Sequence, residues 1–260
     1  MKTLDLLLLV GICNNASSQF NFYGGYSGAV PKGAMAENIK MLHSLNVGGN
    51  HTIPGTCGRL VAGLDLSVGT YANERKEQTF NFGNGTSTKT FVNYSSNVLQ
   101  LNLAAKALLL KNSPINPYLS GKAGWASFYS NIYIEDPADA GGCKALDQRN
   151  ILKDGTMMAA YGGGLMIDLS LFASKSGKGT RYIDLSVNRV RGGNVSYINT
   201  KKLIDASNPP TNTTGKAVNV KFINATTQQI HEHQVAEVYT TPMKFLEFKL
   251  SAVFNLTGCF

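Results

Sequence analysis

The most constraining feature of this sequence is the strict alternation of side-chain polarity in its last segment. Even-numbered positions from 246 to 260 are apolar or glycine, whereas most odd-numbered positions there are polar. Successive side chains of a β-strand point to opposite faces, so this period of two predicts a strand with one apolar face. The same alternation recurs in residues 59–71, 98–109, 157–171 and 181–188. Strands of this kind therefore dominate the predicted fold.

Eight strands accommodate the alternating segments. They are predicted near residues 20–28, 37–47, 59–81, 87–110, 117–134, 156–172, 180–198 and 243–257. Residues 35–46 also suit a short helix, because Ile39, Leu42 and Leu45 would share one helical face. Residues 216–241 are predicted to be part of a long loop that contains strand-like stretches.

The composition excludes several other fold classes. Of the 260 residues, 43% are hydrophobic and 15% are charged, which is typical of a folded chain and not of a disordered one. No run of about 18 apolar residues occurs, so a membrane-crossing helix is excluded. The content of Gly, Tyr, Phe and Asn argues against a coiled coil. The length suits one domain with a single core or barrel.

Alternation alone leaves the orientation of the apolar faces open. In a soluble calyx they would point inward, whereas in a membrane barrel they would contact lipid. Predicted strands of about 15–20 residues exceed the usual globular length, and the final amphipathic strand ends in the aromatic residue Phe260. Both features favour the membrane barrel. The predicted fold class is therefore all-β: a transmembrane antiparallel up-and-down β-barrel of eight strands.

The predicted connections differ in length. Those at residues 48–58, 111–116 and 173–179 are short, whereas those at 135–155 and 199–242 are long. Outer-membrane barrels combine an even number of strands with short periplasmic turns and longer external loops. The two long connections are therefore predicted to face the outside of the cell.

The first residues are predicted to be a targeting segment. Lys2 precedes an apolar run at residues 6–12, and the small residues 16–18 follow it, as in a secretory signal peptide. Cleavage after Ser18 would leave residues 19–260 as the barrel domain. The net charge of +8 would not change, because Lys2 and Asp5 are removed together.

Three cysteines follow this cleavage site, and an odd number excludes a fully paired disulfide scaffold. Cys57 lies in a predicted short turn and Cys259 at the end of the last strand, so both are predicted at the periplasmic rim. We hypothesise that Cys57 and Cys259 form a disulfide, and that Cys143 is free. Alkylation of both thiols without prior reduction would reject this pairing.

Six charged residues would line the interior if the apolar faces point to lipid. They are Asp65, Lys106, Lys122, Asp184, Glu247 and Lys249. Side chains nearly fill the interior of an eight-stranded barrel, so these groups would form either an ion path or a packed core of paired charges. We favour the packed core.

Signals for other chemistry are weak. His231 and His233 would lie on one side of a strand, but a metal site needs a third or fourth ligand, so none is predicted. No His lies beside a nucleophile in a predicted strand, so no enzyme activity, catalytic residue or cofactor is expected. The positive charge is spread without basic–aromatic clusters, which argues against nucleic acid as a partner. Contact with anionic lipopolysaccharide near the rim is a milder interpretation of this charge.

Three short motifs resemble those of a known family. They are NPYLSGKAGW at 116–125, YGGGL at 161–165 and RYIDLS at 181–186. With these motifs the chain resembles, over about residues 20–260, the small outer-membrane β-barrel proteins of Gram-negative bacteria and their outer membrane protein beta-barrel domain. The last strand, with Phe248, Phe254 and Phe260, resembles the C-terminal signal that the barrel-insertion machinery reads. The family includes adhesins, small porins, lipid-modifying enzymes and subunits of secretion or assembly complexes.

We therefore expect an integral protein of the bacterial outer membrane that acts as a non-enzymatic structural or interaction subunit. The resemblance permits a secretion or outer-membrane assembly complex as its setting. The expected partners are outer-membrane lipid and lipopolysaccharide, the barrel-insertion machinery and other envelope proteins. A passive small-solute pore is the first alternative, and a lipid-modifying enzyme is the second.

Overall fold

A computed structural model describes most of the chain. The described residues are 20–56, 58–82, 85–110, 113–138, 145–171, 181–204, 214–223 and 230–255. The predicted signal peptide at residues 1–18 lies outside them, as do all three cysteines that follow it and Phe260.

Nine β-strands make up almost all of the described structure. They are β1 (Phe20–Pro31), β2 (Leu42–Thr52), β3 (Leu60–Asn81), β4 (Ser87–Leu108), β5 (Ile115–Glu135), β6 (Ala145–Asp168), β7 (Arg181–Ile198), β8 (Lys216–Ile223) and β9 (Ile230–Asn255). A short helix, α2 (Met35–Asn38), lies between β1 and β2, and a 3-10 turn, η2 (Leu169–Leu171), follows β6.

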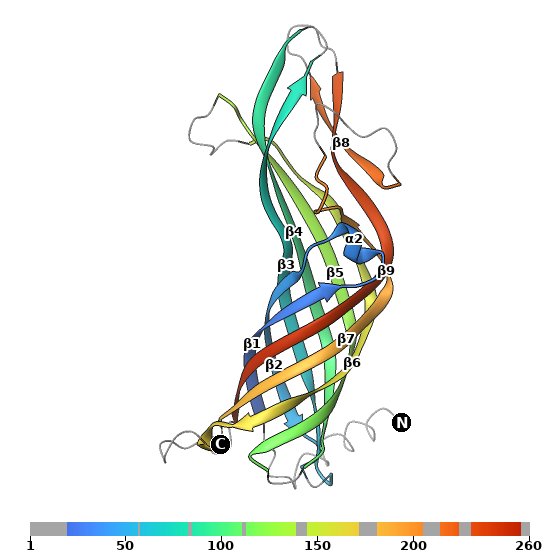
Figure 1. Ribbon diagram of the computed structural model, residues 1–260. Helices are drawn as coiled ribbons and strands as arrows, with labels where there is room; N and C mark the ends of the chain where they lie inside the picture. Colours follow the sequence, from blue (N-terminus) through green and yellow to red (C-terminus); the bar gives the residue numbers. More distant parts are fainter. Residues whose placement is uncertain are drawn as a thin grey trace, which may run out of the picture.

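Eight of these strands form a closed ring. Neighbours pair antiparallel in the order β1-β2-β3-β4-β5-β6-β7-β9, and β9 pairs with β1 to close the ring. Strand β8 pairs with β9 outside the ring. Figure 1 shows the ring as a cylinder of oblique strands. The structure thus confirms the predicted eight-stranded antiparallel barrel with up-and-down topology.

The register around the ring fixes the stagger of the barrel. Following directly paired residues from Asn21 through all eight strands returns to β1 at Pro31, ten residues further along the strand. With about 3.3 Å per residue along a strand and about 4.8 Å between strands, this offset requires a tilt of about 40°. The tilt lies in the range usual for closed barrels.

The strands carry their apolar side chains on the outside of the ring. Leu64, Leu101, Leu103 and Met157 are all more than half exposed, whereas the alternate position Asp65 is 1% exposed. Similar exposed apolar residues occur on every strand of the ring. The orientation is therefore the one predicted for a membrane barrel and the reverse of a soluble calyx.

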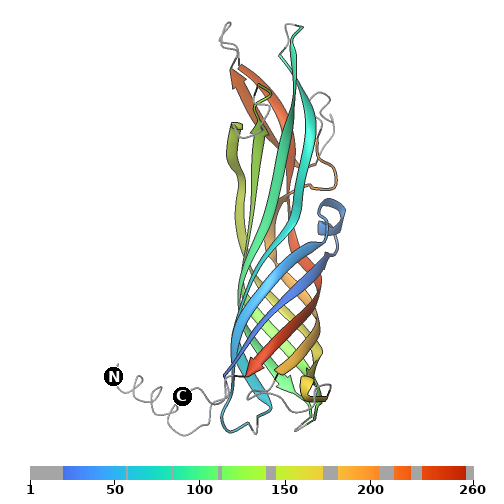
Figure 2. The same cartoon turned by 90° about the vertical axis from the view of Figure 1, so that its left-hand side faces the viewer.

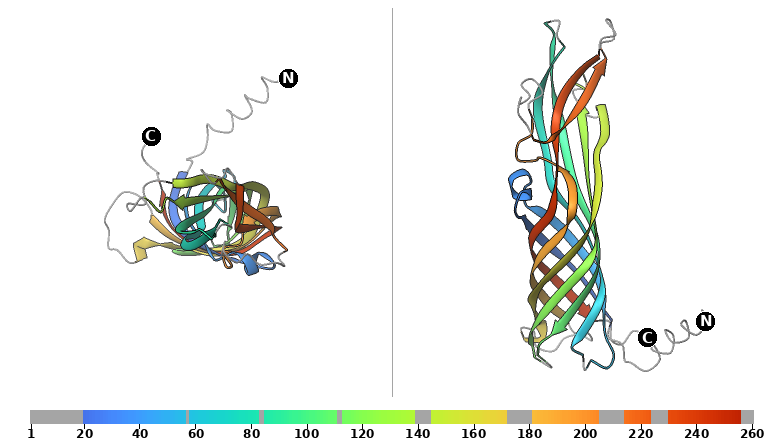
Figure 3. Two further views of the ribbon diagram at one scale, coloured as in Figure 1. Left: turned by 90° about the horizontal axis from the view of Figure 1, so that it is seen from above. Right: turned by 90° about the vertical axis from the view of Figure 1, so that its right-hand side faces the viewer.

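Several strands continue beyond the ring on one side. Strand β2 pairs with β3 only as far as Thr70, whereas β3 runs on to Asn81. The described residues within 73–96, 129–154 and 194–241, which we call the extension, project beyond the ring as paired strands (Figures 2 and 3). Strand β1 begins and β9 ends at the opposite end of the ring, where Asn21 pairs with Asn255.

The described residues of the two long connections predicted at 135–155 and 199–242 are largely strand. Strand β6 begins at Ala145, and β8 together with the first half of β9 occupies much of the second segment. These residues pair in hairpins of the extension, which compensates for their weak alternation. Residues 35–46 contain both predicted elements, because α2 ends at Asn38 and β2 begins at Leu42.

Candidate functional site

The structure brings the six predicted interior charges together inside the ring. They come from five strands: Asp65 on β3, Lys106 on β4, Lys122 on β5, Asp184 on β7, and Glu247 and Lys249 on β9. The exposed fraction of their side chains is at most 18%. Three of the six are cations and three are anions, so the set, here called the lumen cluster, has no net charge.

Ion pairs connect the members of the lumen cluster. The Lys122 ammonium lies 2.9 Å from a carboxylate oxygen of Glu247 and 3.9 Å from one of Asp65. Asp65 also pairs with Lys249. Lys106 and Asp184 form a separate pair. Each buried charge therefore has an opposite charge beside it, which is the condition under which a low-dielectric interior tolerates ions.

Neutral polar groups complete the lumen cluster, and sequence reasoning assigned them no role. The hydroxyl group of Tyr23 donates to Asp65 at 2.8 Å, and that of Tyr118 donates to Asp184. The amide of Asn188 donates to Glu247 at 3.1 Å. The ammonium group of Lys249 lies 4.5 Å from the ring centroid of Tyr23, within cation–π range. The only available signal was that these residues occupy inward positions of their strands.

Little space remains between these side chains. The cavity lined by Tyr23, Asp65, Lys122 and Asp184 has a volume of about 20 Å³. That is of the order of one water molecule, because a single probe sphere needs about 10–15 Å³. The lower lumen is therefore packed.

An apolar core fills the lumen between the lumen cluster and the extension. Tyr71 and Phe128 face each other with ring centroids 6.0 Å apart. The core also contains Met35, Ile39, Leu42, Val98, Ala126, Met158, Val190, Val195, Tyr197, Met243 and Phe245, all buried. Helix α2 contributes Met35 to this core and lies beside β9 near the end of β1 (Figure 1). The described interior thus changes from polar to apolar along the axis.

The extension has an apolar core of its own. Its buried members are Phe80, Val92, Tyr94, Ile132, Ile134, Ile198, Val220, Val235 and Ala236. Tyr94 is satisfied inside this core, since it accepts from the Gln78 amide at 2.7 Å and donates to the carbonyl of Val235 at 2.8 Å. The hairpins of the extension are consequently packed against one another.

A charged group on the outside of the extension joins three strands. The guanidinium of Arg75 on β3 donates two hydrogen bonds of 2.7 Å to Glu135 on β5, and Asn93 on β4 adds a third of 2.7 Å. The hydrogen bonds from Arg75, followed by the one from Asn93, lower the pKa of Glu135 to about 2. The guanidinium also stacks 3.6 Å above the ring centroid of Phe91.

The remaining predicted residues lie apart from the lumen. His231 and His233 are on β9 in the extension, where the His233 ring packs edge-on against Phe80 with centroids 5.2 Å apart. Phe248 and Phe254 are about half exposed on the outside of the ring. Among the described residues, no group of three or more His, Cys, Asp or Glu side chains is placed to hold a metal ion.

No helix within the described ranges has the length and apolar character needed to cross a membrane.

Comparisons with known proteins give structural matches alone. No protein-family model matches the chain, and no curated protein matches it in sequence. Neisserial surface protein A is similar at 10% identity over 93% of this chain and 97% of that chain, with a TM-score of 0.40. A major outer membrane protein from Thermus thermophilus is similar at 12% identity, with 93% and 100% covered and a TM-score of 0.43. The outer membrane protease OmpT from Escherichia coli is similar at 10% identity over 92% of this chain and 95% of that chain, with a TM-score of 0.28.

Proposed function

We propose that this chain is an integral outer-membrane barrel that serves as a non-enzymatic structural or interaction subunit of an envelope complex. The observation that carries this proposal is the combination of an apolar outer wall with a packed lumen. The wall suits a lipid environment, and the packed lumen suits a role other than conduction.

The outer wall supports membrane insertion. Leu45 is 70% exposed and Leu103 is 68% exposed, and comparable residues continue around the ring. Soluble monomers rarely expose contiguous apolar patches larger than a few hundred Å². A closed ring also leaves no strand edge unpaired, which is the requirement for strands in hydrocarbon. Lipid would cover this wall and remove its apolar area from water.

The packed interior favours a scaffold over a pore. Any solute would have to pass both the ion-paired lumen cluster and the apolar core above it. Burying an ion without a partner in such an apolar layer is costly. Passage would therefore require the buried aromatic residues to leave their positions.

The extension is the part best suited to bind other proteins. By analogy with the short periplasmic and long external connections of such barrels, it would project from the outer surface. Two large apolar side chains lie exposed on it, Leu146 at 49% and Ile230 at 62%. Exposed apolar residues away from lipid are candidates for protein contacts.

Two measurements test the proposal. Purified protein in planar bilayers should give no discrete, stable channel openings, and such openings would favour the pore instead.

Cross-linking in intact envelopes followed by mild-detergent purification should recover stoichiometric partners, and L146S/I230S should lose them. The matched control Q148S/K89S changes exposed polar residues of the extension and should retain them. Equal recovery from both variants would contradict a role for the extension.

A further inference from the structure

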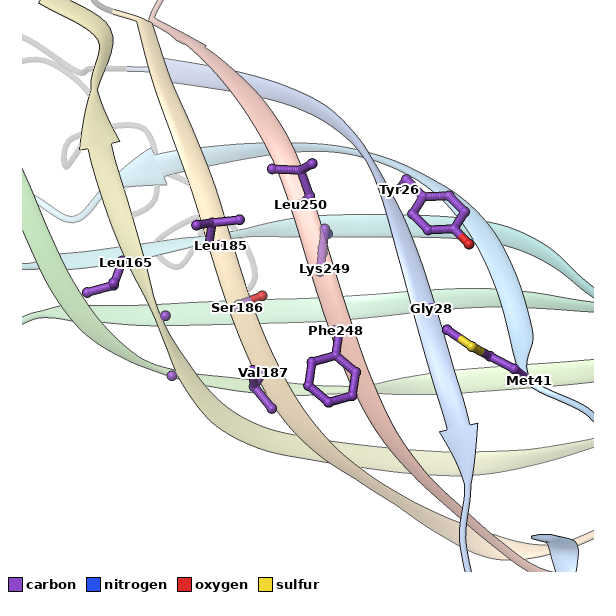
Figure 4. Close-up of a pocket in the computed structure, with 12 residues that line it drawn as sticks. Tyr26, Gly28, Met41, Leu165, Leu185, Ser186, Val187, Phe248, Lys249 and Leu250 are labelled. Carbon is purple, nitrogen blue, oxygen red and sulfur yellow. The ribbon is translucent and has the colours of Figure 1, made fainter. Parts of the chain in front are cut away.

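The outer wall of the ring contains a groove that crosses four strands. Two rows of directly paired residues outline it: Leu165, Leu185, Leu250 and Tyr26 in one row, and Gly163, Val187, Phe248 and Gly28 in the next. Figure 4 shows the labelled members of these rows along β6, β7, β9 and β1. The groove has a volume of about 570 Å³, and apolar side chains dominate its lining.

Two glycines lie in the wall of the groove, and neighbouring groups already occupy the place that their side chains would take. A Cβ atom on Gly28 would lie 2.1 Å from the methyl carbon of Met41, and one on Gly163 would lie 2.8 Å from the carbonyl oxygen of Tyr118. Both glycines occupy positions where their strands would otherwise direct a side chain outward. The apolar lining of this groove matches the chemistry of lipid acyl chains.

Three cations border the groove on the side of the extension. On β7, Arg189 and Arg191 follow Val187 at successive outward positions, and Arg191 pairs directly with Lys244 on β9. All three side chains are exposed. We call Arg189, Arg191 and Lys244 the wall triad. None of them has an ion-pair partner within the described part of the chain.

The arrangement of the wall triad is unfavourable without an anion. Like charges at directly paired positions of an antiparallel sheet destabilise it, as for Arg191 and Lys244. Arg189 is further constrained, because its neighbours across the two adjacent strands are Tyr161 and Leu246 on the apolar wall. A phosphate group would offset up to about two of the three positive charges and accept hydrogen bonds from both guanidinium groups.

We propose that the groove and the wall triad form a binding site for one lipid A molecule, with an acyl chain in the groove and a phosphate on the triad. This inference rests on the proposed membrane insertion with the extension outside. In that orientation the triad lies near the headgroups of the outer leaflet, where lipopolysaccharide supplies acyl chains and phosphates together. Charge complementarity and the adjoining apolar channel select this occupant over a neutral lipid.

Native mass spectrometry of the full chain in detergent, titrated with purified bisphosphorylated lipid A, tests the site. Wild type should retain one lipid A molecule, and R189Q/R191Q/K244Q should lose affinity on the order of 100-fold, given about a fivefold effect for each of the three basic side chains. The control K89Q/K153Q/K216Q removes the same charge from exposed positions outside the triad and should bind like wild type. Equal losses in both triple variants would overturn the site.

A second variant tests the groove without altering charge. V187W keeps an apolar side chain on the outer wall but fills the groove, so lipid A affinity should fall at least about tenfold, the scale of one lost packing contact. V47W makes the same change on β2, outside the groove, and should leave affinity unchanged. Retention of phosphatidylglycerol as tightly as lipid A, with the same sensitivity to V187W, would overturn the assignment to lipid A.

Failure of this site is distinguishable from failure of the proposed function. Carbonate extraction and bilayer recording of the same variants report insertion and conduction independently of lipid retention. An inserted, silent barrel that binds lipid A equally well with and without the wall triad would reject the site alone.

Discussion

The lumen cluster makes a quantitative prediction about paired substitutions. D65N removes one anion that contacts both Lys249 and Lys122, and leaves the interior with an excess positive charge. K249M removes a cation and leaves an excess negative charge. The double variant D65N/K249M restores neutrality with two cations and two anions. The three variants therefore separate the effect of a lost contact from that of an unbalanced buried charge.

Burial sets the expected size of the effect. Asp65 is 1% exposed and the Lys249 side chain 7%, so solvent screens this pair far less than a surface pair. Two unit charges about 4 Å apart, the separation of Lys122 and Asp65, interact by about 4 kcal/mol at an effective dielectric constant of about 20. Breaking a buried pair from one side costs about 3–5 kcal/mol. We expect each single variant to lose about this much, and the double variant to lose at least about 2 kcal/mol less than the two losses added together.

Equilibrium urea unfolding in lipid vesicles measures these differences. The sequence has one tryptophan, Trp125, which is 48% exposed on the outer wall and reports its lipid environment by fluorescence. Wild type and all three variants should unfold with the same urea dependence, so that their midpoints are comparable. Single-variant losses below about 1 kcal/mol, or strictly additive losses, would refute the view that the lumen is a packed core of paired charges.

Three further predictions concern other parts of the molecule. L103K places a cation on the outer wall and should cost about 2–4 kcal/mol in vesicle refolding, whereas N97K, above the apolar residues of β4, should cost little; equal values would contradict the membrane orientation. F128A should lose about 3–5 kcal/mol by urea unfolding, because it opens a cavity in the apolar core, and a loss under about 1 kcal/mol would show that the core collapses around it. The Glu135–Arg75 pair should protect the extension fully above pH 4.5 and lose this effect as the pH falls through about 2, since the folded pKa is lowered. Hydrogen exchange should show this acid dependence in wild type, and E135Q should lack it.

Alternation predicted the ring well, because every ring strand has one face toward the lumen and one toward the outside. In the extension it predicted β3, β4, β5 and the end of β7, but it assigned residues 145–155 and 216–241 to long loops, because strand faces there meet neither lipid nor a polar lumen. Bulges also break the period of two, as between Thr70 and Ala72 on β3. The last strand was predicted to begin at residue 243, whereas β9 begins at Ile230 and includes Pro242, although proline is disfavoured inside sheets. The strand continues through Pro242 because a register shift after Arg191 accommodates it.

The candidate site was predictable in composition and not in connectivity. The sign of the charge and the inward-facing position of Asp65 and Lys249 could be derived from the sequence, because the alternation shows which residues point inward. Their pairing depends on the stagger of the closed ring, which sums offsets from eight strands and has no local signal. The same limit applies to Tyr23 as a partner of Asp65. For the wall triad, the sequence predicted only a contact with anionic lipid near the rim and did not indicate which residues would make it.

The distribution of the lumen cluster along the chain has a consequence for biogenesis. Asp65 is synthesised early, whereas its partner Lys249 is among the last residues of the chain. Lys122 is likewise synthesised well before its partner Glu247. A nascent sheet that lacks β9 already balances two cations against two anions, but Asp65 lacks its partner Lys249 and Lys122 lacks its partner Glu247. Docking of the final strand therefore completes these ion pairs in the same step that closes the ring.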